Sequence, residues 1–131
     1  MFSKDMLPKE PLKAEESVII NLQDFLDGGG THWVCAFADE FCVDYFDSYG
    51  LPPLDVVKKW MERSKLVVRY SCNEIQDLRS IMCGWYCLLF LHDRVHNRSA
   101  TDILLDFDSC PSAHNERIVK PFARETLRAR Y

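Results

Sequence analysis

The chain has no long hydrophobic run, no internal repeat and no low-complexity tract. Its uninterrupted apolar stretches last only a few residues, whereas a membrane-spanning helix needs about 20. The opening segment, MFSKDMLPKEPLKAEES, has no apolar core behind its basic residues, so it does not resemble a secretory signal. The sequence therefore excludes a membrane span and predicts a polar lead-in over residues 1–16 that packs loosely.

Nothing divides the chain into parts. With 131 residues, 47% of them hydrophobic and 27% charged, it suits one compact domain over residues 1–131. The net charge of −4 gives no general argument for nucleic acid, but residues 114–131 carry +3 and the remainder −7. A solvated helix face explains this basic C-terminal segment best, with an acidic partner or a phosphate backbone as alternatives.

The cysteines do not follow a zinc-knuckle or secreted pattern. There are six, and no Cys-x₂-Cys motif occurs. Without a signal and with a sizeable core, buried reduced thiols are expected, which places the protein in the nucleus or cytosol. Two i, i+4 pairs, Cys83 with Cys87 and His92 with His96, could suggest zinc, but they are five residues apart and cannot share one helix face. We therefore expect no metal cofactor.

Hydrophobic periodicity and turn residues predict an α+β fold with a small central β-sheet and surrounding helices. Strands are expected over residues 17–22, 32–38, 41–46 and 65–70. Helices are expected over residues 54–63, 82–95, around 103–107 and around 122–130. The positions expected to be buried in two of these helices are Val56, Val57, Trp60, Met61, Cys87, Leu88, Phe90 and Leu91.

Cys83-Gly84 is the first candidate for chemistry. The thiol would lie at the N-terminus of the most apolar helix, where unpaired backbone N–H groups and the helix dipole favour a thiolate. Glycine at position 84 would let a backbone N–H approach a substrate oxyanion without a Cβ in the way. Taken alone, Cys-Gly fits better with a small buried cysteine leading an apolar helix.

Three upstream residues could complete a catalytic centre with that thiol. His32 follows the glycines of Asp27-Gly28-Gly29-Gly30 and opens a strand, and Asp47 ends the neighbouring strand, from which it could reach the imidazole. Asp44, the competing acid, should point to the other face. Gln76 could donate its side-chain amide to a developing oxyanion.

The motifs that hold these residues resemble the adenovirus protease (adenain) family, whose wider clan includes the SUMO and other ubiquitin-like-protein proteases. They are Gly30-Thr31-His32-Trp33-Val34, Tyr45-Phe46-Asp47-Ser48-Tyr49-Gly50, and Gln76 with six residues before Cys83-Gly84. The second motif, followed by Leu51-Pro52-Pro53, looks closest to the proteases of Maverick/Polinton-type transposons and related DNA viruses. The resemblance covers about residues 7–93.

The resemblance implies a papain-like cysteine protease with a thiol nucleophile at the tip of a buried helix. Position by position, Cys83 would be the nucleophile, His32 the general base and Asp47 the residue that orients the base. Gln76 and the Cys83 backbone N–H would form the oxyanion hole. Trp33 would narrow the substrate channel, so that cleavage occurs at or next to glycine, and Gly30 and Gly84 would be further substrate-binding residues.

The same resemblance implies a biological setting. It suggests a monomeric viral enzyme that processes capsid precursor proteins during virion maturation, in the nucleus or cytoplasm of a host cell or in the virion. Adenain is stimulated by DNA and by a capsid-derived peptide; the acidic body of this chain argues against DNA activation, and nothing in the sequence points to the peptide. Relatives usually run longer, so this chain would be a minimal or fragmentary form.

Two alternatives share the fold. One is an isopeptidase that removes ubiquitin or SUMO, and the other is a binding module that has lost catalysis. All four catalytic positions hold competent residue types, which argues against such a loss.

Overall fold

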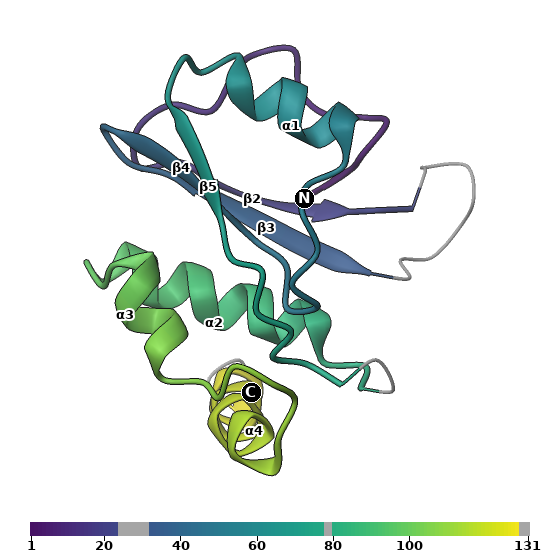
Figure 1. The fold of residues 1–131 in the computed structure, drawn as a ribbon, viewed down its shortest axis with the longest axis vertical. Helices are drawn as coiled ribbons and strands as arrows, with labels where there is room; N and C mark the ends of the chain where they lie inside the picture. Colours follow the sequence, from purple (N-terminus) through teal and green to yellow (C-terminus); the bar gives the residue numbers. More distant parts are fainter. Residues whose placement is uncertain (24–31, 78–79, 129–131) are drawn as a thin grey trace.

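The computed structural model of the chain describes residues 1–23, 32–77 and 80–128, which form one five-stranded sheet with helices on both faces (Figure 1). The strands are β1 (Phe2–Ser3), β2 (Ser17–Asn21), β3 (Trp33–Ala38), β4 (Cys42–Phe46) and β5 (Val67–Tyr70). The helices are α1 (Asp55–Glu62), α2 (Cys83–Val95), α3 (Ala100–Leu105) and α4 (Ala113–Arg128). The predicted α+β class is therefore confirmed.

The sheet has the order β1-β2-β3-β4-β5. Its three inner strands pair antiparallel, and the outer strands β1 and β5 add to them in parallel. β3 lies in the middle, with Cys35 opposite Phe46 of β4 and opposite Ile19 of β2. The predicted hairpin of the second and third expected strands is confirmed.

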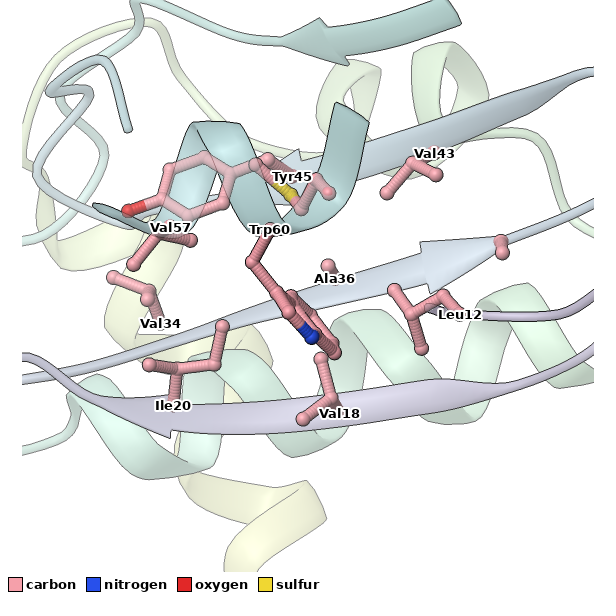
Figure 2. Close-up of a cluster of buried hydrophobic side chains, with 11 residues drawn as sticks. Leu12, Val18, Ile20, Val34, Ala36, Val43, Tyr45, Val57 and Trp60 are labelled. Atoms are coloured by element: carbon pink, nitrogen blue, oxygen red, sulfur yellow. The ribbon is translucent and has the colours of Figure 1, made fainter. Parts of the chain in front are cut away.

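Both faces of the sheet are covered, which explains why β3 reads as continuously apolar. α1 lies on one face, and α2, α3 and α4 lie on the other (Figure 1). Under α1, strand residues meet Val57, Trp60 and Met61, whose i, i+3, i+4 spacing makes one helix stripe (Figure 2). Val56 was also expected to be buried, but it is 47% exposed because it lies beside the row formed by the three buried residues of α1.

The second core lies between the sheet and α2. The buried members of this core are Cys35, Phe37, Phe46, Ile75, Tyr86, Cys87, Leu89, Phe90, Leu91, Ile103 and Val119. Neighbours on the sheet, on α3 and on α4 together bury most of α2, so its apolar composition matches its place. Leu88 departs from the expectation, because it is 39% exposed on the outer side of the helix.

The β3–β4 turn forms without glycine. Asp39 Oδ1 accepts hydrogen bonds from the backbone N–H groups of Phe41 and Cys42, both at 2.7 Å. A side-chain oxygen that bonds the backbone two or three residues ahead mimics a backbone turn. The Asp39 side chain thus stabilises this turn through its hydrogen bonds to the backbone.

The lead-in, expected to pack loosely, is held against the domain. Phe2–Ser3 pairs with β2, and Leu12 is buried in the core under α1. Trp60 Nε1 donates to Pro8 O at 2.9 Å, which ties the segment to α1. These contacts are made to residues far away in the chain, so the polar local pattern did not reveal them.

The last helix is longer than predicted. α4 begins at Ala113 rather than near Phe122, because Ser112 Oγ accepts a hydrogen bond from Asn115 N at 3.2 Å and caps the helix. Pro121 lies inside it, where proline usually ends a helix. α3 begins earlier than predicted, at Ala100, and ends at Leu105, before Phe107.

Within the described ranges, no helix has both the length and the apolar character required to cross a bilayer. The basic residues of the C-terminal segment lie along α4. Arg117, Lys120, Arg124 and Arg128 are all exposed.

Candidate active site

Three candidate residues are placed at one end of the sheet. His32 directly precedes β3, Asp47 directly follows β4, and Cys83 is the first residue of α2. The β3–β4 register, extended past the strand ends, puts position 32 opposite 49 and diagonal to 47, within reach of long side chains. Because α2 packs against β3, its N-terminus arrives at the same end.

His32 and Asp47 are joined directly. Nε2 of His32 and Oδ1 of Asp47 are 2.7 Å apart, and the carboxylate is almost fully buried. Oδ1 also accepts a hydrogen bond from the backbone N–H of Tyr49 at 2.8 Å. The bond to Asp47 occupies Nε2, so Nδ1 is the ring nitrogen left for another partner.

The turn after Asp47 depends on glycine. Gly50 has φ of +72° and donates its N–H to Asp47 O at 2.9 Å. A Cβ built on Gly50 would lie 2.6 Å from the backbone carbon of Asn73. Gly50 therefore lets the segment around Asn73 lie directly against the turn that carries the carboxylate.

Tyr49 forms one wall of the site. Its ring stacks on that of His32, with centroids 4.2 Å apart and planes 12° from parallel. Burial, followed by the negative charges of Cys83 and Asp47, raises the pKa of the Tyr49 hydroxyl. The ring thus restricts rotation of the imidazole and stays neutral beside it.

The Cys83 thiol is more acidic than an ordinary cysteine. Burial alone would raise its pKa, but the His32 side chain and the backbone N–H groups of Trp33 and Gly84 outweigh burial and lower the pKa. Positive charge and N–H donors favour the thiolate, which is the nucleophilic form.

The His32 ring is correspondingly more basic. Burial would lower its pKa, but the hydrogen bond to Asp47, the interaction with Cys83 and the negative charges of both raise the pKa from 6.5 to about 9. Nδ1 itself is buried and makes no hydrogen bond of ordinary geometry to any residue within the described ranges. At neutral pH these shifts favour a thiolate beside an imidazolium.

Gln76 lies on the segment that contacts the Asp47 turn. Ser48 O accepts hydrogen bonds from Ile75 N at 2.9 Å and Gln76 N at 3.1 Å, and Ser48 Oγ donates to Gln76 Oε1. The Gln76 side chain is fully buried, and its Nε2 donates to Ser80 O at 3.0 Å. An amide nitrogen carries two N–H groups, so a second donor remains for an oxyanion.

Of the three residues predicted to bind substrate, Trp33 and Gly84 lie within the described residues. Trp33 lines two surface hollows of about 390 and 340 Å³, and Gly84 lines the second. A Cβ at Gly84 would meet nothing closer than the Trp33 side chain at 3.9 Å, so packing within the chain does not require glycine there. Gly30 belongs to residues 24–31 and lies outside the described residues.

Asp44, the competing acid, serves a different cluster. Its carboxylate pairs with Arg69 at 2.8 Å and with buried Arg94 at 3.2 Å. Arg94 also pairs with Asp39 and lies over the Phe37 ring. The expectation that Asp44 points away from His32 is confirmed.

The residues that suggested zinc do not converge. Cys83 and Cys87 are buried, whereas the rings of His92 and His96 lie farther along α2, with centroids 4.4 Å apart and planes tilted by 32°. Among residues 1–23, 32–77 and 80–128, no group of three or more His, Cys, Asp and Glu side chains is arranged to hold a metal ion.

Two residues of the site had not been assigned a role from the sequence. Tyr49 stacks on His32, and Ser48 ties Gln76 to the Asp47 turn. For Tyr49 a signal existed, because extending the hairpin register pairs position 49 with position 32. For Ser48 there was none, because its partner is 28 residues away.

The chain is similar in sequence and structure to viral cysteine proteases. The chain is 34% identical over 94 residues to the "SUMO-1 cysteine protease S273R" of an African swine fever virus isolate from Kenya. That match covers 62% of this chain and 34% of the viral protein. A South African isolate gives 35% identity over 89 residues, covering 58% of this chain and 33% of the relative. No protein-family model matches the chain.

Solved structures give the same result. One crystal structure of the African swine fever virus pS273R protease matches with a TM-score of 0.53 and 34% identity, covering 65% of this chain and 36% of that one. A second matches with a TM-score of 0.56 and 26% identity, covering 76% and 39%. The chain is thus homologous to these proteases and spans about a third of the length of the curated relatives it matches.

Proposed function

We propose that the chain is a cysteine protease of the papain-like type found in adenain and the ubiquitin-like-protein proteases. Homology to the viral cysteine proteases supports this proposal. The observation that carries it is the meeting of an acidified Cys83 thiol, a basic His32 ring and a buried Asp47 carboxylate at one end of the sheet. These groups are the nucleophile, base and orienting acid of acyl transfer.

In the first half of the reaction, Cys83 Sγ attacks the carbonyl carbon of the scissile peptide bond. The C–N bond then breaks, and His32 gives its proton to the leaving amine. In the second half, His32 takes a proton from water as the water oxygen attacks the thioester carbon. The C–S bond then breaks, which releases the carboxylic acid product and restores the Cys83 thiolate beside protonated His32. Asp47 keeps the imidazole aligned and supports its positive charge throughout.

The tetrahedral intermediates carry a negative oxygen that needs donors. The backbone N–H of Cys83, at the N-terminus of α2, and the second N–H of Gln76 Nε2 are the donors proposed here. Ser48 and Ser80 hold the Gln76 amide before substrate arrives, which supports a preorganised oxyanion hole.

The substrate would carry glycine at or next to the cleaved bond. Trp33 lines two surface hollows, and Gly84, the residue that follows Cys83, lines one of them. A narrow passage under an indole ring excludes side chains on the substrate. Because internal packing leaves room for a Cβ at Gly84, any need for glycine there would come from the substrate.

The natural substrates would be capsid precursors of a virus or virus-like transposon of the adenain or Maverick/Polinton kind. The viral origin of the homologues supports this assignment. The enzyme would act in the infected cell or in the virion.

An isopeptidase is the second candidate, and the name of the viral relatives favours it. The homologue from African swine fever virus is called a "SUMO-1 cysteine protease". A catalytically inactive binding module is the third, and the acidified thiol argues against it.

The experiment compares the purified chain with Cys83→Ala on a library of peptides and on a SUMO conjugate. We expect the parent to cleave peptides that contain Gly-Gly and the variant to cleave none while keeping its circular dichroism spectrum. Preference for the conjugate over every peptide would favour the isopeptidase. Equal turnover by parent and variant would remove the protease proposal.

A further inference from the structure

The backbone of Trp33 is placed unusually within the sheet. His32 O accepts a hydrogen bond from Leu22 N at 3.0 Å, so residue 32 bonds toward β2. Alternate residues of an antiparallel strand direct their N–H and C=O groups to opposite neighbours, so those of Trp33 point toward β4. β4 ends at Phe46, which pairs with Cys35. Trp33 therefore directs both backbone groups past the end of β4.

Two cysteines on consecutive turns of α2 occupy that position. The N–H of Trp33 hydrogen-bonds the Cys83 sulfur. The Cys87 thiol donates to Trp33 O at 3.3 Å. Residues i and i+4 of a helix lie on one face, so a single helix face supplies partners to both groups of one peptide residue. Through these two cysteines, α2 provides the hydrogen-bond partners that β4 would provide to Trp33 if the strand continued past Phe46.

The two thiols sit in opposite electrostatic environments. Cys87 is fully buried, and burial, followed by its interaction with Cys35, raises its pKa well above the usual range. Cys87 therefore keeps its proton at neutral pH and remains a donor, whereas Cys83 tends toward the thiolate. Cys35 contacts Cys87, and its Sγ lies 3.8 Å from Cys87 O.

We propose that Cys87 is a positioning residue for the active site. By holding the Trp33 carbonyl, its thiol fixes the residue that follows His32, and so aims the Trp33 N–H and the imidazole at Cys83. This inference rests on the proposed protease function, because the positioning role matters only if Cys83 is the nucleophile. The reactivity of the Cys83 thiol can nevertheless be measured without a substrate.

The test measures how fast iodoacetamide alkylates Cys83 between pH 5 and pH 9 in the full chain, followed by mass spectrometry of the peptide that contains Cys83. Cys87→Ala and Cys87→Val remove the donor with a smaller and a larger side chain, and Cys87→Ser restores a donor. A hydrogen bond contributes about 0.5–1.5 kcal/mol, so we expect alkylation at pH 7 to slow about 2- to 10-fold in the two variants without a donor. The pH midpoint should move upward in both and return in Cys87→Ser.

Cys42→Ala is the matched control, because it removes a thiol from the start of β4, where Cys42 pairs with Val67 at the end of the strand remote from Asp47. It should keep the parent profile. Parent-like profiles in whichever of Cys87→Ala and Cys87→Val folds, or equal slowing in Cys42→Ala or Cys87→Ser, would overturn the proposal. If the chain cleaves no peptide but the expected alkylation pattern appears, the protease proposal fails while the positioning role stands.

Discussion

Asp47 combines two functions in one carboxylate oxygen. Oδ1 accepts the bond from His32 Nε2 and also the backbone N–H of Tyr49, so the acid holds both the imidazole and the turn that follows β4. Burial of the His32 ring disfavours its charged form, and the Asp47 carboxylate together with Cys83 more than offsets this effect. The residue is thus tied to catalysis through the charge and the direction of the ring.

Removing that carboxylate should lower activity severely. We expect Asp47→Ala to reduce kcat/KM for a Gly-Gly peptide by about 10²- to 10⁴-fold, because the imidazole loses its alignment and its counter-charge. Steady-state kinetics on the folded variant measure this directly. Activity within about threefold of the parent would show that another acid orients His32.

Tyr49 should matter through its ring rather than its hydroxyl. Tyr49→Phe keeps the stack on His32 and is expected to retain the parent kcat. Tyr49→Ala removes it and should lower kcat about 2- to 10-fold, since such an aromatic contact contributes about 0.5–1.5 kcal/mol. If the two substitutions behave alike in kinetic assays, the ring does not position the imidazole.

At the scale of elements, the ends of β3, β4 and α2 define the site. β4 stops at Phe46, and the turn that follows both presents Asp47 and receives the segment of Ile75 and Gln76. This arrangement requires close backbone contact at Gly50, whereas Gly84 on α2 has space around it. The two glycines should therefore respond differently to the same substitution.

Gly50→Ala should destabilise the fold by about 1–3 kcal/mol or more, because φ is positive and the added Cβ meets backbone of Asn73. Gly84→Ala should instead stabilise α2, by up to about 1 kcal/mol, while reducing turnover of glycine substrates. Urea denaturation and kinetics on both variants provide the comparison. Equal loss of stability in the two would contradict the packing described for these positions.

The cluster of Asp44, Arg69 and Arg94 links β4, β5 and α2. Asp44→Ala leaves buried Arg94 with the partly exposed Asp39 as its remaining carboxylate partner among the described residues, so we expect a loss of about 3–5 kcal/mol in the free energy of unfolding. Glu62→Ala is the control, because its pair with Lys58 is exposed and should contribute less than about 1 kcal/mol. An unchanged urea midpoint for Asp44→Ala would mean that the cluster is not stabilising.

At the scale of the whole molecule, the fold is a sheet covered on both faces, with the site at one end (Figure 1). Local patterns were enough to predict β2, β3, β4, α1 and α2, because their hydrophobic spacing matches the faces that they bury. The placement of Asp44 away from His32 also followed from strand alternation. The sequence predicted these elements and the placement of Asp44 because they depend on residues that are close together in the chain.

Features that depend on distant contacts were not predicted. The lead-in is ordered by Trp60 and by β2, and neither contact has a signal within residues 1–16. The start of α4 depends on the Ser112 cap, which the preceding proline obscured. Cys87 was expected to be a packing thiol, and its bond to Trp33 O appears only when α2 is docked on β3.

The ionisation states of Cys83 and His32 depend on single side chains, on the N-terminus of α2 and on burial by the whole domain. Because the Cys83 pKa is lowered and the His32 pKa is raised, both groups are charged between the two values. Activity should therefore rise as Cys83 ionises and fall as pH passes about 9, where His32 loses its proton.

The most direct measurement is an NMR titration of the His32 ring in the parent chain and in Cys83→Ala. The parent should titrate near 9, and removal of the thiolate should move the midpoint downward, because its interaction and charge help to raise that pKa. A parent midpoint near the ordinary 6.5, unaffected by the substitution, would contradict the thiolate–imidazolium pair at the centre of this account.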